Sequence, residues 1–276
     1  MAQSSKATPT RPGRLSTVEK WNSETDVAIV GVGGAGACAA IEASDAGAEV
    51  CIFEATAASG GSTALSSAEV YMGGSGGTRV QKACGYNDTT EDMFNFLMAA
   101  QGDLADEAKI RMYCENSVGH FDWLVRMGAK YKDSELKERA IMAMTDDCLL
   151  YTGNEKSHPF REIAKPCPRG HNLEIVGDNG GPMLIGVLTE NVEKRPIRVE
   201  LSVRALCRVA DDDNAVYGRV VRSVGGEGNV PARRGGGPGA APPTLHRPPP
   251  RPPTPPSRSV SSAVLTPYPS APPSAP

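Results

Sequence analysis

The sequence predicts an α/β protein built on a parallel sheet, and three observations lead to this fold class. A short apolar run, residues 26–30, breaks into closely spaced glycines. Small residues that suit a helix follow as far as residue 46. A second apolar run, residues 49–54, ends on a carboxylate. Strand, tight turn, helix and strand in this order form a βαβ unit with parallel strands.

The turn between the first strand and the helix has the spacing of a dinucleotide-binding motif, Gly31-Val-Gly-Gly-Ala-Gly36. Gly31 permits the tight turn, Gly33 lets the backbone approach a pyrophosphate, and Gly36 lets the helix pack close to the strand. The helix N-terminus, with Gly34 and Ala35, presents N–H groups and a partial positive charge to phosphates. These features predict a Rossmann-like nucleotide-binding domain.

Glu54 closes the second strand, 18 residues past Gly36. At this distance a carboxylate accepts hydrogen bonds from the adenosine ribose hydroxyls, with Ala55 beside it in the predicted site. An acidic residue here disfavours a 2′-phosphorylated cofactor, since like charges would meet.

A loop rich in glycine and hydroxyl groups, Ser59-Gly-Gly-Ser-Thr63 with Ser66, favours FAD over NAD. Its N–H and O–H donors can wrap the diphosphate and flavin side of FAD, a contact that NAD domains do not need. The predicted FAD-binding residues in this loop are Gly60, Gly61, Ser62, Thr63 and Ser66. A flexible Gly/Ser loop and an NAD-binding dehydrogenase domain are the alternatives.

Several segments resemble the FAD-dependent oxidoreductase 2 family, which includes fumarate reductase flavoproteins and 3-ketosteroid dehydrogenases. The resemblance covers about residues 25–235 and is carried by residues 26–54, 60–66, 71–74, 120–124, 159–166 and 168–171. Leu149-Leu-Tyr-Thr-Gly153, with the blocks at Pro159 and Pro168, looks nearest to the 3-ketosteroid Δ4-(5α)-dehydrogenase branch.

The resemblance implies a bound FAD that exchanges hydride with a steroid-like or dicarboxylate substrate. It also implies that the strand at Val203 passes the adenine and offers it a backbone hydrogen bond. The family's catalytic residues come after the point where this chain diverges, so none is assigned. One departure concerns the two glycines that usually follow the serine matching Ser66. Here Ser67 and Ala68 follow, and then Glu69. The two added side chains could crowd the flavin ring, and the nearby carboxylate would disfavour an anionic reduced flavin.

Thr89 is the expected start of a helix, and a longer helix is predicted from about Ala105 to Met127, with Gly128 ending it. Periodicity then fades, so residues 129–181 form a predicted loop-rich insertion. Its histidines and cations either hold an anion or form an ordinary solvated loop. They are His158, Arg161, Lys165, Arg169 and His171. No spacing predicts a metal site.

Pro182 suits a first helical position, and strands at residues 197–201, 203–209 and 216–221 predict a small β-meander. The last part of the chain is different, because residues 231–276 hold 16 of the 23 prolines. Prolines at this density cannot donate the hydrogen bonds of a sheet. We therefore expect a disordered tail at 236–276. Before it, we expect a disordered leader at 1–24 and an incomplete FAD-binding domain at 25–235.

Three interpretations of the tail stay open: an out-of-frame translation, an inert extension, or a polyproline ligand that makes the chain a non-enzymatic adaptor. Before residue 231 the net charge is −8, which excludes a basic nucleic-acid-binding body. No apolar run is long enough to span a bilayer. Seven cysteines without a C-x-x-C pair suit a reducing compartment, so a cytoplasmic location is expected.

Overall fold

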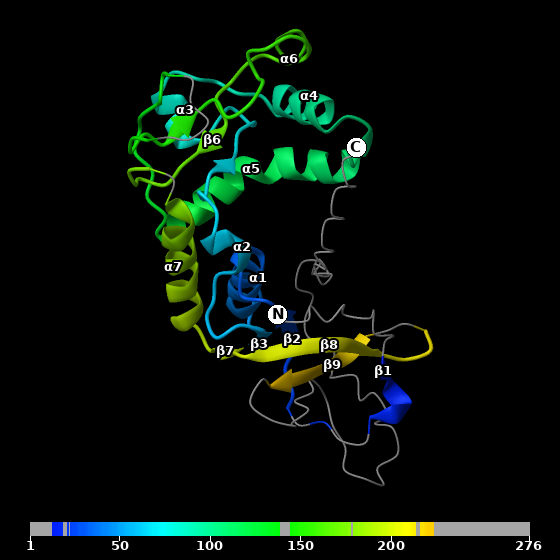
Figure 1. Cartoon of the computed structure of the whole chain (residues 1–276). Helices are drawn as coiled ribbons and strands as arrows, with labels where there is room; N and C mark the ends of the chain where they lie inside the picture. Colours follow the sequence, from blue (N-terminus) through cyan, green and yellow to red (C-terminus); the bar gives the residue numbers. More distant parts are fainter. Residues whose placement is uncertain are drawn as a thin grey trace, which may run out of the picture.

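The computed structural model describes residues 13–18, 21, 23–138, 144–177, 179–213 and 216–223. The predicted tail 236–276 and most of the predicted leader 1–24 lie outside these residues. One end of the described fold carries a parallel sheet and a hairpin, and the other carries most of the helices (Figure 1).

The predicted βαβ unit is present. Strands β2 (Val27–Val30) and β3 (Val50–Phe53) are parallel, with Val27 opposite Val50, and α1 (Gly34–Asp45) connects them. β3 is the central strand, between β2 and β7 (Ile197–Glu200), and all four of its residues are buried. The sheet is therefore parallel throughout, as the sequence predicts.

The predicted β-meander is wrong for its first strand. β7 pairs in parallel with β3, because α7 (Gly180–Glu193) acts as the crossover helix that returns the chain in the same direction. Only β8 (Val203–Ala210) and β9 (Val216–Ser223) form an antiparallel hairpin.

A short strand, β1 (Gly13–Arg14), pairs in parallel with β8 and is followed by a 3-10 turn, η1 (Leu15–Thr17). The expectation of a disordered leader is therefore corrected for Gly13 and Arg14, whose pairing with β8 fixes their backbone.

The helical end contains two long helices packed on each other, α4 (Thr90–Gln101) and α5 (Glu107–Met127). Thr89 caps α4 by accepting a hydrogen bond from the N–H of Asp92, and α5 ends at Gly128 with φ +110°, both as predicted. The shorter elements of this end are α3 (Arg79–Ala83), η2 (Gly102–Leu104) and α6 (Phe160–Ile163).

A small antiparallel sheet lies within the helical end, in the order β4-β6-β5. Its strands are β4 (Val70–Tyr71), β5 (Leu149–Leu150) and β6 (Gly170–His171). Two of the three fall in the predicted loop-rich insertion, so this insertion is more ordered than its lack of periodicity suggests.

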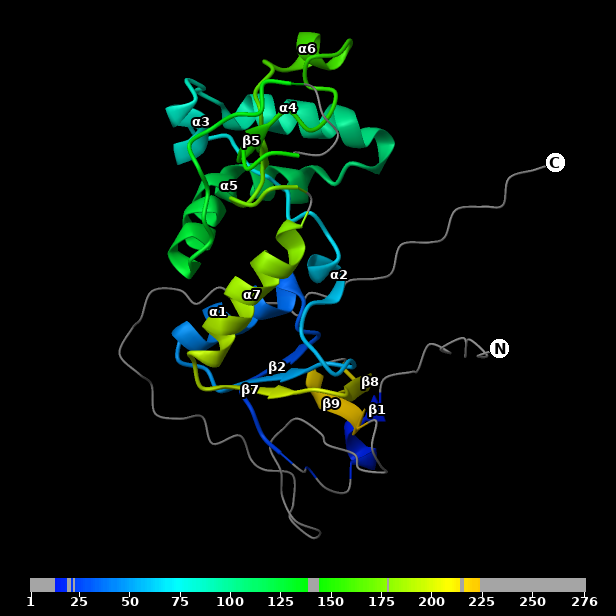
Figure 2. The same ribbon diagram turned by 60° about the vertical axis from the view of Figure 1, so that its left-hand side comes forward.

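α7 links the two ends of the fold, since it packs against α1 at the sheet end and against α5 at the helical end (Figure 2). It also packs against the short helix α2 (Gly61–Ala64). One hydrophobic core runs through both ends and includes Ile41, Ile52, Phe121 and Leu188. Among the described residues, no helix combines the length and the apolarity that crossing a membrane requires. All seven cysteines are free thiols.

Candidate cofactor site

The glycine turn has the backbone geometry that requires glycine. The N–H of Gly31 donates to the carbonyl of Phe53 at 2.8 Å, and Gly31 has φ +90°. A Cβ at Gly36 would lie 1.9 Å from the carbonyl oxygen of Gly31, so helix α1 can approach the turn only without a side chain there. A Cβ at Gly31 would meet nothing within 4 Å, so this side of the turn faces open space.

A second loop, which we call the Ser/Gly loop (residues 59–68), lies directly on the glycine turn. The N–H of Gly60 donates to the carbonyl of Val32 at 3.1 Å, and Gly33 and Gly60 form a parallel bridge. The N–H of Gly34 donates to Thr63 Oγ1 at 3.0 Å. The fold therefore brings together two groups of predicted site residues that are nearly 30 positions apart.

Backbone donors remain at the start of α1. In the part of the chain that the structure describes, the N–H groups of Ala35 and Gly36 donate to no protein acceptor. They lie at the positive end of the helix dipole. The nearby side chain of Ser62 is exposed on α2. Free N–H groups, a hydroxyl and an open side of the turn are the donors and space that the diphosphate of FAD needs.

Glu54 is buried at the carboxyl end of β3, with 8% of its surface exposed. Its Oε2 accepts the N–H of Val32 at 2.9 Å, and its Oε1 accepts both the N–H and the Oγ1 of Thr56 at 2.8 Å. Burial alone would raise the pKa of Glu54, but these hydrogen bonds outweigh burial and hold the pKa below its ordinary value of 4.5.

A carboxylate offers about four acceptor positions, so three donors leave roughly one for a ribose hydroxyl. The sequence reasoning missed Thr56. A hydroxyl residue two positions after a carboxylate is a frequent local hydrogen-bond partner, and this signal could have indicated it.

Val203 lies beside Glu54 but differs from expectation in one respect. Its N–H donates to the carbonyl of Glu54 at 2.7 Å, so this N–H is not available to an adenine. Its side chain is buried with Cys51 and Phe53. Ala55 is half-buried directly after Glu54.

Around Ser67 and Ala68, where the chain departs from the family pattern, the Ser/Gly loop forms a tight turn. Ser66 Oγ donates to the carbonyl of Thr63 and accepts the N–H of Ala68, which closes the turn. Ala68 has φ +57° and is buried. Its methyl group lies against Gly180 at the start of α7.

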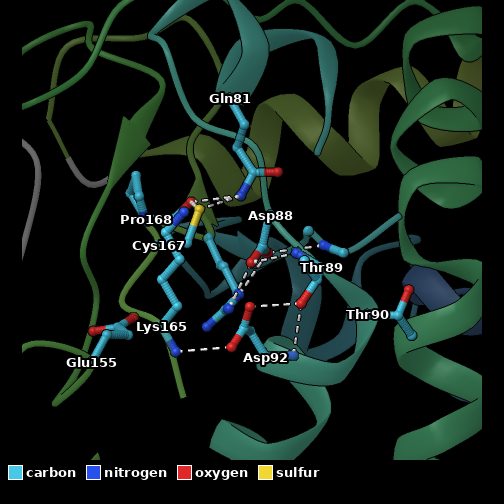
Figure 3. Close-up of polar contacts among 12 residues, drawn as sticks. Gln81, Asp88, Thr89, Thr90, Asp92, Glu155, Lys165, Cys167 and Pro168 are labelled. Carbon is cyan, nitrogen blue, oxygen red and sulfur yellow. Dashed lines mark hydrogen bonds and ion pairs between the residues drawn. The ribbon is translucent and has the colours of Figure 1, made fainter. Parts of the chain in front are cut away.

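The predicted solvated cluster in the insertion is wrong for Arg169 and His171, because both are fully buried. The guanidinium of Arg169 forms a bidentate ion pair with Asp88, at 2.7 Å for both contacts. Figure 3 shows Asp88 with Gln81, Cys167 and Pro168 on one side and Asp92 and Lys165 on the other. His158 and Arg161, in contrast, are exposed and contact Glu162.

His171 is a structural residue in this geometry. One ring nitrogen contacts Thr78 Oγ1 at 2.8 Å and the other contacts the carbonyl of Arg169 at 2.9 Å. Burial lowers its pKa from 6.5 to about 4, so the ring is neutral near pH 7. The described residues contain no group of histidine, cysteine and carboxylate side chains that could hold a metal ion.

The fold and the two stacked loops define a nucleotide-binding flavoprotein domain. Residues 26–236 match the FAD binding domain family, and the chain belongs to this family. The cofactor is therefore FAD, as the Ser/Gly loop predicts.

Relatives by sequence include a steroid dehydrogenase and a fumarate reductase. The 3-oxo-5-alpha-steroid 4-dehydrogenase of Comamonas testosteroni is 30% identical over 205 residues, which are 73% of this chain and 37% of the relative. The fumarate reductase (cytochrome) of Shewanella frigidimarina is 28% identical over 199 residues, 72% of this chain and 30% of the relative.

Solved structures similar to the chain include a ketosteroid dehydrogenase and a fumarate reductase. One is the 3-ketosteroid-delta4-(5alpha)-dehydrogenase of Rhodococcus jostii RHA1 in complex with 4-androstene-3,17-dione, with 43% identity and a TM-score of 0.76. The similarity covers 81% of this chain and 47% of that one. The other is an open flavocytochrome c3 fumarate reductase, with 26% identity and a TM-score of 0.62, covering 77% and 32%. The chain thus spans about a third to a half of these relatives.

Proposed function

We propose that the glycine turn, Glu54 and the Ser/Gly loop hold FAD. In this proposal the N–H groups at the start of α1 bind the diphosphate, Glu54 accepts a ribose hydroxyl, and the Ser/Gly loop lies toward the flavin. Residues 25–235 are the proposed FAD-binding domain, and residues 236–276 are a proposed separate tail.

The observation that carries this proposal is the contact between the two loops. The Gly33–Gly60 bridge and the hydrogen bond from Gly34 to Thr63 hold the Ser/Gly loop against the phosphate-binding turn. An NAD-binding domain does not need such a second loop, whereas FAD has a flavin mononucleotide half that the loop can cover.

We propose further that the chain is the cofactor-binding part of an FAD-dependent oxidoreductase whose substrate is a 3-ketosteroid. The support is the 43% identity to a ketosteroid dehydrogenase structure, against 26% for the fumarate reductase structure. When bound, FAD supplies reversible hydride transfer to a carbon activated by a neighbouring carbonyl. The chain's own residues bind and orient the cofactor, with donors at Ala35 and Gly36 and an acceptor at Glu54.

Separate titrations with FAD and with NADH test the choice of cofactor. FAD and NADH are each added to the purified full chain, and binding is followed by the change in intrinsic and cofactor fluorescence. We expect FAD to bind at least tenfold more tightly than NADH. Tighter binding of NADH would favour the dehydrogenase-domain alternative.

A second titration tests the substrate class on the FAD-loaded chain. We expect 4-androstene-3,17-dione to change the visible spectrum of the bound flavin, and fumarate at equal concentration to leave it unchanged. The reverse result would favour a dicarboxylate substrate.

A further inference from the structure

The N-terminus of α7 lies against the Ser/Gly loop at unusually close range. A Cβ at Gly181 would lie 2.2 Å from the carbonyl oxygen of Ser66 and 2.5 Å from that of Thr63. A Cβ at Gly180 would lie 2.2 Å from the carbonyl oxygen of Ser67. All three neighbours are backbone atoms, which cannot turn aside as the end of a flexible side chain can. Each position therefore requires glycine.

The close approach is used for a hydrogen bond. The N–H of Gly181 donates to the carbonyl of Ser66 at 2.9 Å. The loop carbonyls thus point at the positive end of a 14-residue helix, where their partial negative charge is stabilised. This arrangement fixes the direction of the peptide groups at Ser66 and Ser67.

Because the peptide group is planar, this contact also fixes the direction of the N–H group on the other side of the loop. In a trans peptide the C=O and N–H point in opposite directions. Because the carbonyl of Ser66 points at α7, the N–H of Ser67 points away from it. Within the described part of the chain, this N–H has no acceptor.

We infer that Gly180 and Gly181 are positioning residues for the cofactor: they hold the carbonyls of the Ser/Gly loop against α7 and so present the Ser67 N–H to bound FAD. The inference rests on the proposed function, since it takes the Ser/Gly loop as the surface that faces FAD. It assigns a role to α7, which contributes no residue to the predicted site.

The test replaces Gly181 and Gly180 by alanine, one at a time. The matched control is Gly186→Ala on the same helix, where a Cβ would meet nothing within 4 Å. All three changes favour the helix by up to about 1 kcal/mol, so helix propensity cannot explain a loss confined to the first two positions. Measurements are the Kd for FAD, the visible spectrum of the bound flavin, and far-UV circular dichroism without FAD.

We expect Gly181→Ala and Gly180→Ala to keep the helical signal, to weaken FAD binding at least tenfold and to shift the flavin spectrum. Gly186→Ala should stay within twofold of the unmodified chain. A folded Gly181→Ala protein with unchanged Kd and spectrum would overturn the inference and leave the proposed function standing. Failure of the unmodified chain to bind FAD would instead overturn the proposed function itself.

If the alanine variants do not fold, hydrogen exchange on the unmodified chain tests the inference instead. We expect FAD to raise protection at residues 60–68 and at 180–184 together. Protection that rises in the glycine turn and the Ser/Gly loop but not at 180–184 would overturn the inference.

Discussion

Ala68 holds a backbone conformation that alanine rarely adopts, with φ +57°. The strain costs about 1–2 kcal/mol. Glycine would relieve it but would lose a buried methyl group, worth about 0.8 kcal/mol, and add about 0.4–1 kcal/mol of chain entropy on unfolding. We therefore expect Ala68→Gly to change the free energy of unfolding by less than about 1 kcal/mol.

The control for this prediction is Ala40→Gly, at a fully buried position inside α1. There the methyl loss and the helix propensity of glycine add to about 2 kcal/mol of destabilisation. Urea denaturation of both variants measures the difference. Equal losses would show that Ala68 is not strained.

The hydrogen bonds of Glu54 lead to a prediction about FAD binding. In Glu54→Gln one carboxylate oxygen becomes an NH₂ group, which cannot accept the hydrogen bonds from Val32 or Thr56. The change also removes the charged acceptor for the ribose hydroxyl of FAD. A hydrogen bond to a charged group contributes about 1.5–3 kcal/mol, so FAD binding should weaken roughly 10- to 100-fold. Fluorescence titration measures this, with the exposed Glu49→Gln as control. Unchanged affinity in Glu54→Gln would remove Glu54 from the site.

The buried ion pair joins Arg169, the residue directly before β6, to Asp88 in the α3–α4 connection. Asp88 and Arg169 are 1% and 0% exposed in their side chains. Asp88→Asn leaves a buried guanidinium without its counter-charge, and we expect a loss of about 3–5 kcal/mol in the free energy of unfolding.

Asp133→Asn, in the half-exposed pair with Arg79, is the control and should cost under about 1 kcal/mol. Chemical denaturation of both variants decides the matter. Similar small losses would mean that the buried pair does not hold the small sheet in place.

His171 makes the stability of the same region depend on pH. Its pKa is about 4 in the fold and about 6.5 in the unfolded chain, so the unfolded state binds more protons between these values. Stability should therefore fall as pH drops from 6.5 to 4, by about 3 kcal/mol from this residue.

His171→Gln should remove this pH-dependent loss, whereas the exposed His158→Gln should retain it. The measurement is the free energy of unfolding in urea across that pH range. The same slope in His171→Gln and in the unmodified chain would contradict the assignment.

Elements with strong local signals could be predicted from the sequence. The βαβ unit and the helix that ends at Gly128 have clear periodicity and defined ends. The strands β4, β5 and β6 could not be predicted, because two residues carry no periodicity and their pairing depends on distant contacts. The partner of β7 also depends on a long-range property, the crossover through α7.

At the scale of the whole molecule, the residues of the site were easier to predict than the contacts between them. The sequence indicates both the glycine turn and the Ser/Gly loop, but their stacking follows from the packing of α2 and α7. For the same reason the sequence did not indicate Gly180 and Gly181, whose importance lies in the carbonyls that surround them. The buried state of Arg169 was missed because its partner, Asp88, lies 81 positions away.

The most direct measurement is the flavin content of the whole chain after reconstitution. The purified protein is incubated with excess FAD, passed through gel filtration and examined by visible absorbance and circular dichroism. The structure and its family predict about one FAD per folded chain. A folded chain that elutes colourless after this treatment would contradict the assignment of the stacked loops as an FAD site.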